Sequence, residues 1–325
     1  MNPVPRHPAL AVLCVALIPI ACSRARDADK APAAPGLVPA SAPSSFASAQ
    51  PPASASSSEL ESGIPSASAS AVPTTPPSAP DAGADPGCLT EMARVGRACI
   101  DRYEAHLVLP GDGGQDAVHP YFERPQKGVS YKAVAAPGVF PQAYINRLEA
   151  EQACTNAGKR LCSLAEWYRA CQGSRGFIYP YGNTETKGKC NSGKGHLLSK
   201  FFGTNSRNWK YEDHFNSPML DQQPGFLART GEYASCVSSY GVFDLVGNVH
   251  EWISDKVDPS LSTKIPLQED IQKKVGPRTG NAIFMGGFFS TTSEHGKGCR
   301  FVTIGHEAKY HDYSTGFRCC RDAKP

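Results

Sequence analysis

Ten cysteines between residues 88 and 325 constrain the fold of this chain more than any other feature. An even number of cysteines in an exported domain is typical of a disulfide framework, and ten allow up to five bridges. No two of them have the Cys-x-x-Cys spacing of a zinc site, so metal binding by cysteine is the weaker alternative. The ten are Cys88, Cys99, Cys154, Cys162, Cys171, Cys190, Cys236, Cys299, Cys319 and Cys320.

Export is predicted from residues 1–22, which have the layout of a signal peptide. Arg6 precedes an apolar run that is too short to span a bilayer as a mature helix. The small residue Ala21 directly precedes Cys22, so the segment resembles a bacterial lipoprotein signal in which Cys22 is lipidated. The alternative is an ordinary cleaved signal with an incidental cysteine. We expect a cell-envelope protein, lipid-anchored at the outer membrane or in the periplasm.

Residues 23–87 are predicted to form a disordered linker that tethers the domain to the membrane. From Ala31 to Pro80, 37 of 50 residues are Ala, Ser or Pro. Such a composition cannot bury enough apolar surface to offset the entropy of ordering the chain. Residues 88–325 then form one domain, which is long enough for a sizeable core.

The charge balance argues against a nucleic-acid partner. The net charge is only +3, and no long run of Lys or Arg occurs. The sequence also lacks a glycine-rich phosphate loop after a strand and a Gly-x-Ser-x-Gly nucleophile elbow. Any partner is therefore expected to be recognised by shape and by specific groups.

Two helices are predicted in the first half of the domain. Residues 141–157 have helical spacing, with Leu148 on the apolar face, and Gly158 ends this segment as a left-handed cap. A second helix follows, because Ser163 and Glu166 have the spacing of a capping box.

The rest of the domain reads as long loops around short strands. Strands are expected after Cys99 and at residues 283–287 and 315–319. Asp101 and Glu104 follow the first of these strands as a close carboxylate pair. We interpret them as a salt-bridged surface feature, with acid/base catalysis as the alternative.

Five ordered motifs give the domain a recognisable pattern: GKRLCSLAEWYRAC at 158–171, YPYGN at 179–183, YGVFDLVGNVHEW at 240–252, MGGFF at 285–289 and GFRCC at 316–320. Together they resemble the sulfatase-modifying-factor family, whose best-known members are formylglycine-generating enzymes. The resemblance implies an α+β fold of C-type-lectin-like (formylglycine-generating-enzyme) type. Such a fold has two helices, a small twisted sheet and extensive irregular loops.

The resemblance also implies two structural disulfides, at the positions of Cys154 with Cys319 and of Cys171 with Cys299. The other six cysteines are additional to the family pattern. Cys88 and Cys99 are close enough in sequence to pair locally. For the rest our expectation is that Cys162 pairs with Cys320, and Cys190 with Cys236.

Calcium is the cofactor that the resemblance implies for the stretch at 241–252. The family's enzymes wrap the ion with groups that match the side chains of Asp244 and Glu251 and the carbonyls of Gly247 and Val249. Such hard oxygen ligands suit calcium. A second set is matched by Asn191, the Ser192 carbonyl, Asp213 and the Phe215 carbonyl. The alternative is that Asn248 and Glu251 only satisfy turn amides.

Copper is not expected, although the family's enzymes bind copper(I) through two thiolates just after the Gly-Gly motif. Here that segment, residues 288–298, contains no cysteine, and thiolates are the ligands that hold copper(I). Phe288 and His250 also replace a Ser and a Trp that are usual in the family. The family is an oxidoreductase family, but whether this chain is an enzyme stays open.

A different metal offers one route to catalysis. The groove candidates His250, Phe288, Glu294, His295 and His306 would lie on or near the family's substrate groove. A His/Glu set among them could hold iron. The alternative is that His295 and His306 are solvated loop residues and that His250 is a packed turn residue, since no two share a metal-binding local spacing.

The function that these observations favour is a calcium-stabilised, membrane-tethered binding module for a peptide, protein or glycan of the envelope or the extracellular space. The alternative is an oxidative enzyme, either a formylglycine-generating oxidase or a non-haem iron-dependent oxygenase, that acts on a cysteine or peptide substrate. Function follows the site rather than the fold, and the missing thiols favour the binding module.

Overall fold

The structure, a computed structural model, describes residues 85–111 and 115–325. The predicted signal at 1–22, its lipidation site Cys22 and nearly all of the predicted linker lie outside the described residues. Within the described ranges, no helix has both the length and the apolar character needed to cross a bilayer.

One four-stranded sheet joins the beginning of the domain to its end. It contains β1, β2, β11 and β6 in that order, and all neighbours pair antiparallel. The strand expected after Cys99 is β2, and the last strand of the chain lies between β2 and β6. The bounds are Met92–Val95 for β1, Ala98–Asp101 for β2, Arg160–Leu161 for β6 and Cys319–Asp322 for β11.

A second four-stranded sheet, with the order β10-β7-β8-β9, carries most of the two late segments that were expected to be strands. Gly286 and Gly287 lie beyond the end of β8, and the segment at 315–319 breaks at Arg318, so that Cys319 belongs to β11 of the first sheet. β10 pairs parallel with β7, so that Gly316 lies opposite Glu251. The bounds are His250–Lys256 for β7, Ala282–Met285 for β8, Val302–Thr303 for β9 and Thr315–Phe317 for β10. A three-stranded sheet, β4-β3-β5, is formed by Ala117–Val118, Ala105–Leu109 and Lys132–Ala135.

Helix α1 spans Arg147–Asn156 and is shorter than predicted. It begins late because Asn146 caps its first turn: the Asn146 side chain accepts from the Glu149 amide, and Glu149 accepts from the Asn146 amide, both at 3.0 Å. Leu148, expected on the apolar face, is 44% exposed. The helix instead buries Ala150, Ala153 and Cys154.

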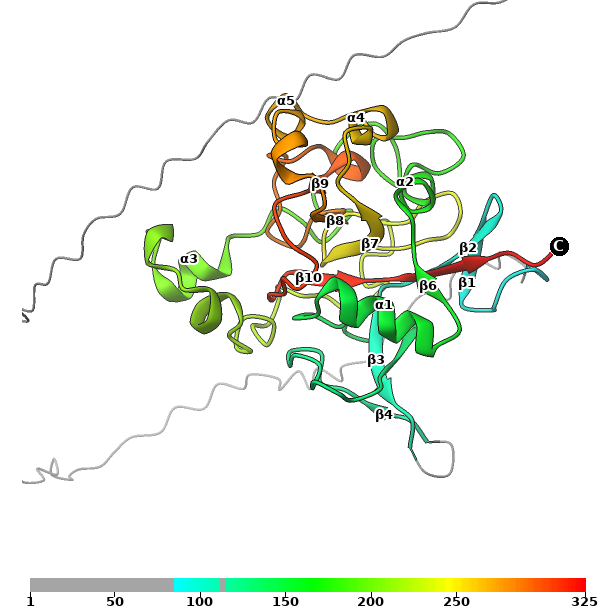
Figure 1. The fold of residues 1–325 in the computed structure, drawn as a ribbon, viewed down its shortest axis with the longest axis horizontal. Coiled ribbons are helices and arrows are strands. Elements are labelled where there is room, and N and C mark those ends of the chain that lie inside the picture. The colour runs from blue at the N-terminus through cyan, green and yellow to red at the C-terminus, as the bar shows by residue number, and fades with distance from the viewer. Residues whose placement is uncertain (1–84, 112–114) are drawn as a thin grey trace, which may run out of the picture. The chain divides into compact units, whose positions relative to one another are not determined.

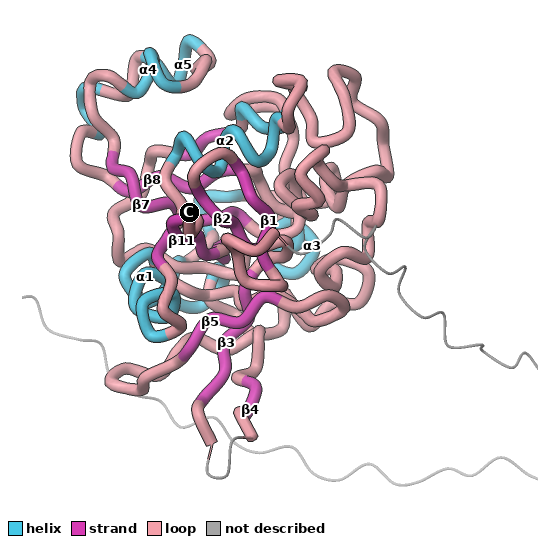
Figure 2. The backbone as a smooth tube through the Cα atoms, turned by 90° about the vertical axis from the view of Figure 1, so that its right-hand side faces the viewer, coloured by secondary structure: helices cyan, strands magenta, loops and turns pink. Residues whose placement is uncertain are grey.

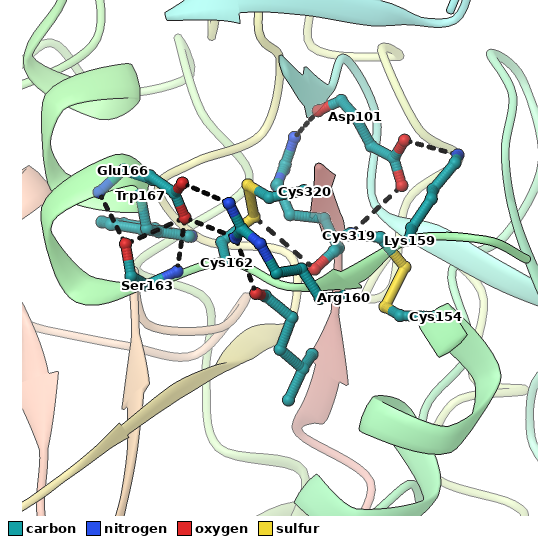
Figure 3. The surroundings of a disulfide bond; sticks show 12 residues. Asp101, Cys154, Lys159, Arg160, Cys162, Ser163, Glu166, Trp167, Cys319 and Cys320 are labelled. Carbon is teal, nitrogen blue, oxygen red and sulfur yellow. Dashed lines mark hydrogen bonds and ion pairs between the residues drawn. A yellow bond between two sulfur atoms is a disulfide. The ribbon is translucent and has the colours of Figure 1, made fainter. Parts of the chain in front are cut away.

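Helix α2 spans Leu164–Gln172 and has the predicted capping box between Ser163 and Glu166. Gly158, between the two helices, has the predicted left-handed conformation with φ 70°. Figure 3 shows Arg160 reaching Glu166, with its Nη2 2.7 Å from Oε1. Trp167 and Cys171 face the core from α2 and are fully buried.

The remaining helices are short and belong to long connections. In Figures 1 and 2, α4 and α5 lie at the end of the domain opposite β3 and β4, and Figure 1 shows α3 on a lobe at one side. Their bounds are Leu197–Phe202 for α3, Leu261–Lys264 for α4 and Glu269–Gln272 for α5. Single helical turns form at Ser206–Asn208, Tyr211–Phe215, Gly276–Arg278 and Gly298–Arg300. The α+β class is therefore confirmed.

All ten cysteines of residues 88–325 form disulfides, and the pairs are the expected ones. They are Cys88–Cys99, Cys154–Cys319, Cys162–Cys320, Cys171–Cys299 and Cys190–Cys236. The adjacent residues Cys319 and Cys320 reach in different directions, to α1 and to the segment just before α2 (Figure 3). Because β11 is bridged on both sides, the C-terminal strand is fixed in the core.

The interpretation of Asp101 and Glu104 as surface residues is wrong, since both side chains are fully buried. Asp101 accepts from Lys159 Nζ at 2.7 Å and from the Cys319 amide at 3.1 Å (Figure 3). It therefore secures β11 beside β2. Glu104 belongs to the site described next.

Candidate functional site

The turn before β7 is held in a conformation that most residues avoid. Asp244 and Asn248 have φ of 59° and 61°, and Gly247 has φ of 84°. A Cβ on Gly247 would collide with the carbonyl oxygen of Asn191. Glycine is therefore required at this position by both conformation and space, and Asp and Asn tolerate the left-handed region better than most residues.

Three carboxylates gather behind this turn around one guanidinium. Arg318 donates to both oxygens of Glu251 at 2.6 Å, and Trp167 Nε1 donates to Glu251 Oε2 at 2.7 Å. Glu104 accepts from Asn248 Nδ2 at 2.6 Å and from the Val249 amide at 3.3 Å. Asp244, Glu104, Glu251 and Arg318 are all buried, and we call them the carboxylate cluster.

The carboxylate cluster has more negative than positive groups. Burial raises the pKa of Glu104 well above its usual range, and the nearby carboxylates of Asp244 and Glu251 raise it further. Burial likewise raises the pKa of Asp244 to about 7, although the Gly231 amide and Arg318 favour its charged form. An additional cation would relieve this excess of acidic groups.

The expected calcium ligands fit this arrangement in part. Asp244 Oδ2 accepts from the Gly231 amide at 2.7 Å, while Oδ1 and the carbonyls of Gly247 and Val249 receive no hydrogen bond from the part of the chain described. Glu251, the fourth expected ligand, is already held by Arg318. No trio of His, Cys, Asp or Glu side chains in the described ranges is arranged to bind a metal, but the expected set contains only two such side chains.

The turn-amide alternative finds little support. The Asn248 Oδ1 atom accepts from the Ala228 amide at 3.0 Å and from Asn191 Nδ2 at 2.8 Å, and both donors lie outside its own turn. Glu251 bonds to Arg318 and Trp167. Both side chains therefore join distant segments instead of capping the local backbone.

The structure does not gather the second expected calcium set. The Asp213 side chain is 65% exposed and pairs with Lys210, whereas Asn191 is buried. The Phe215 carbonyl accepts from the Tyr313 amide at 3.1 Å. Asn191 Oδ1 is buried without a hydrogen-bond partner among the described residues.

Asp221 is a buried acidic residue that sequence reasoning missed. Neither of its carboxylate oxygens has a hydrogen-bond partner within the described ranges. Burial raises its pKa well above the usual range, with a further contribution from Asp312. Asp221 lies in a loop without periodicity or motif, so no signal in the sequence distinguishes it from an exposed loop aspartate.

A cavity of about 410 Å³ lies beside the turn, and all five groove candidates line it. It is formed by residues around the Gly-Gly motif together with residues from segments distant in sequence. Besides His250, Phe288, Glu294, His295 and His306, its walls include His196, Phe284, Phe301, Tyr310 and Tyr313. The sequence predicted the first five but not the last five.

Phenylalanine rings pack against the imidazoles of this cavity. The Phe301 ring centroid is 5.4 Å from that of His250 and 5.5 Å from that of His295. The Phe284 ring likewise packs against His250 and His306, at centroid distances of 4.5 and 5.6 Å. This arrangement does not fit the iron site that a His/Glu set could have formed.

The interpretation of these histidines as solvated or packed residues is correct in part. His250 is packed, with 6% exposure, and burial lowers its pKa well below the usual range. His295 and His306 are half-buried rather than solvated, and burial lowers the pKa of His306 to about 4. The histidines of the cavity are therefore neutral at neutral pH.

The chemistry of the cavity does not fit copper(I). Cys299, the cysteine nearest to the Gly-Gly motif, is bonded to Cys171, and every other cysteine of residues 88–325 is also in a disulfide. Phe288 occupies the position after the Gly-Gly motif and contacts His250 and Tyr313, at ring-centroid distances of 5.1 and 5.7 Å. The position therefore has aromatic packing and no thiolate.

The fold and site define a class of protein: a disulfide-stapled α+β domain with a buried carboxylate turn and a thiol-free aromatic cavity. Residues 97–323 match the model of the sulfatase-modifying factor enzyme 1-like domain, and the chain belongs to this family.

Curated relatives include active and inactive members by name. A formylglycine-generating enzyme from Thermomonospora curvata is 28% identical over 263 residues, covering 73% of this chain and 75% of that enzyme. A formylglycine-generating enzyme from Bos taurus is 26% identical over 252 residues, covering 74% of this chain but only 61% of that enzyme. The Bos taurus inactive C-alpha-formylglycine-generating enzyme 2 is 32% identical over 120 residues, covering 36% of this chain and 33% of that protein.

Among solved structures, PvdO from Pseudomonas aeruginosa is 15% identical, with a TM-score of 0.36 over 69% of this chain and 80% of that one. The M1 variant of the major tropism determinant is also 15% identical, with a TM-score of 0.37 over 71% of this chain and 52% of that one. These likenesses are too distant to bear on function.

Proposed function

We propose that this chain is a non-catalytic binding module of the sulfatase-modifying-factor family. The observation that carries the proposal is that the segment after Gly286-Gly287 contains no cysteine, while all ten cysteines of residues 88–325 are in disulfides. Oxidation of a substrate cysteine through copper(I) needs free thiolates in this position. A cavity of about 410 Å³ remains there, which is the size of a small-ligand pocket.

The comparison with an inactive relative is consistent with this proposal. The name of the Bos taurus protein states that it is inactive, and it is 32% identical to this chain over 120 residues. By its name, this relative is a member of the family that lacks catalytic activity. The iron-dependent alternative receives no support from the cavity, because no three His, Cys, Asp or Glu side chains of the described residues are arranged to hold a metal.

Calcium binding at the turn of residues 244–251 is part of the proposal. Two features support it: the carboxylate cluster has three acidic side chains for one arginine, and three expected ligand oxygens receive no hydrogen bond from the described residues. Calcium prefers such hard oxygen ligands. To complete the set, Glu251 would have to share its carboxylate between the ion and Arg318.

We also propose, from the N-terminal sequence, where the module is located and how it is attached. Cys22 would carry a lipid, and residues 23–87 would tether the domain to the membrane in the cell envelope. The partner would be a peptide, protein or glycan of the envelope or the extracellular space that enters the cavity.

One experiment separates a binding module from an enzyme. The oxidised full chain is purified, and its calcium, copper and iron contents are measured by mass spectrometry. It is then incubated with copper or iron, oxygen and a sulfatase-type cysteine peptide, and the peptide is examined for an aldehyde. The Thermomonospora curvata relative provides the positive control.

We expect bound calcium, no stoichiometric copper or iron, and no aldehyde under conditions in which the relative produces it. Aldehyde formation, or one equivalent of a redox metal per chain, would overturn the binding-module proposal. Absence of calcium would overturn only the proposed ion.

A further inference from the structure

The cavity beside the turn has walls made mainly of rings. Phe284, Phe288, Phe301, Tyr310 and Tyr313 line it together with four imidazoles, whereas no Asn, Gln or Arg is among its described lining residues. Aromatic walls of this kind favour a flat apolar group, which can pack edge-to-face or offset against them. A polyhydroxylated sugar would find few amide or guanidinium partners here.

The charged groups inside the cavity are already engaged. Asp312 accepts from the Ser314 amide and hydroxyl at 2.8 and 2.7 Å and from the Tyr310 hydroxyl at 2.5 Å. Lys194 Nζ donates to the Phe226 carbonyl at 2.7 Å. Glu294 is exposed and lies at the rim. Asp312 and Lys194 therefore each make hydrogen bonds to neighbouring protein groups.

A cationic ligand is also disfavoured, even though aromatic cages elsewhere hold ammonium groups. Burial lowers the pKa of three of the lining histidines, His196, His295 and His306. The cavity thus destabilises a positive charge on its own imidazoles. The same desolvation would act against an ammonium or guanidinium group brought in by a ligand.

His250 supplies an unsatisfied polar group in this apolar surrounding. Its side chain is only 6% exposed and lines the cavity, and Nδ1 is buried without a hydrogen-bond partner in the part of the chain that the structure describes. Nε2 likewise makes no hydrogen bond to the described residues. A neutral imidazole presents one donor and one acceptor, so a hydroxyl, which both donates and accepts, matches either tautomer.

We propose that this cavity binds the side chain of a tyrosine from a protein partner, an inference that rests on the proposed function. The phenol ring would pack between the aromatic walls, and its hydroxyl would hydrogen-bond to the imidazole of His250. A volume of about 410 Å³ falls in the range of small-ligand pockets and accommodates one aromatic side chain with its adjoining backbone.

The test measures binding of capped tripeptides to the oxidised full chain by ligand-observed NMR. The probes are acetyl-Gly-Tyr-Gly-amide, the matched Phe and Lys peptides, and N-acetylglucosamine. We expect the Tyr peptide to bind about fivefold to tenfold tighter than the Phe peptide, because only the phenol can satisfy His250. The Lys peptide and the sugar should bind more weakly still.

The His250→Phe variant should reduce the preference for Tyr over Phe to about one. His214→Phe is the matched control, because its imidazole stacks on Phe202 outside the cavity and should leave the preference unchanged. If His250→Phe fails to fold, the comparison of peptides on the unaltered chain still decides the matter.

Equal affinity for the Tyr and Phe peptides, tighter binding of the Lys peptide or the sugar, or no detectable binding of the Tyr peptide would each overturn this inference. These binding results do not depend on whether the chain converts a cysteine peptide to an aldehyde. A failure of the tyrosine inference is therefore distinguishable from a failure of the proposed function, which the turnover assay decides.

Discussion

Arg318 and Glu251 form a fully buried bidentate ion pair, in which Nε and Nη2 each lie 2.6 Å from a carboxylate oxygen. Arg318 also donates to the carbonyls of Asp101 at 3.0 Å and Phe243 at 2.8 Å. One side chain thereby connects β10 and β11 with the turn and with the end of β2. Removing either partner would leave a buried charge uncompensated.

Arg318→Met should therefore lower the free energy of unfolding by about 3–5 kcal/mol. Urea denaturation of the oxidised protein measures this change. Arg160→Met is the control, because Arg160 binds Glu166 and Asp322 while 40% exposed, and exposed pairs contribute about 1 kcal/mol or less. Equal effects of the two substitutions would contradict the central role of the Arg318–Glu251 pair.

The raised pKa of Asp244 predicts that stability without calcium falls as pH rises. Between pH 3.8 and about 7 the unfolded chain loses the Asp244 proton while the folded chain retains it. The folded state then binds more protons, so its stability decreases through this window and levels off above about pH 7. The full effect is on the order of a few kcal/mol.

Thermal unfolding in EDTA, compared between the unaltered chain and Asp244→Asn, isolates this contribution. Asn tolerates the left-handed φ of 59° at this position and does not titrate. We expect the stability difference between the two proteins to change with pH in EDTA. Calcium should flatten the pH dependence of the unaltered chain. Parallel curves in EDTA would show that Asp244 titrates normally.

Asp221→Asn should stabilise the protein at pH 8 in EDTA by about 1 kcal/mol or more. The unfolded Asp221 is ionised at this pH, whereas the folded side chain is buried without a hydrogen-bond partner among the described residues and has a raised pKa. Asn does not need this proton uptake on folding. The stability gain of the Asn variant over the unaltered chain should therefore decrease as the pH approaches 4. Differential scanning calorimetry measures the effect. Asp213→Asn, at a 65% exposed side chain, should be nearly neutral.

The loss of stability on removing a disulfide should increase with the number of residues in the loop that the disulfide closes. Cys190–Cys236 joins residues separated by 46 positions, and Cys88–Cys99 joins residues separated by 11. Loop entropy predicts a loss of about 4 kcal/mol for the double Ser variant of the first pair and about 3 kcal/mol for that of the second. Guanidinium denaturation gives both values, and the reverse order would contradict an entropic origin.

Much of the fold was predictable because short motifs determine it locally. The capping box of Ser163 and Glu166, the turn at Gly158 and the family pattern of cysteines all act over a few residues or match a known framework. Helix α1 was predicted too long because the competing capping box at Asn146 was not recognised.

Part of the site was predictable, through the motifs and through the layout that the family resemblance implies. His250 and Phe288 stand within recognisable segments, whereas Tyr310, Tyr313 and His196 reach the cavity from loops with no periodicity. The burial of Glu104 depends on its partners Asn248 and Val249, more than a hundred residues later in the chain. Such contacts are set by tertiary packing, which a local pattern does not encode.

The position of β11 between β2 and β6 governs when the domain can fold. Until residues 319–322 have been synthesised, the first sheet lacks its central partner, and β2 and β6 have nothing to join them. The same C-terminal stretch of the chain contains Arg318, Cys319 and Cys320, whose side chains complete the core. The domain therefore cannot assemble from its N-terminal half during translation, as many domains do. Deletion of residues 319–322 would remove the central strand of this sheet together with the two cysteines that bond it to α1 and to the segment before α2.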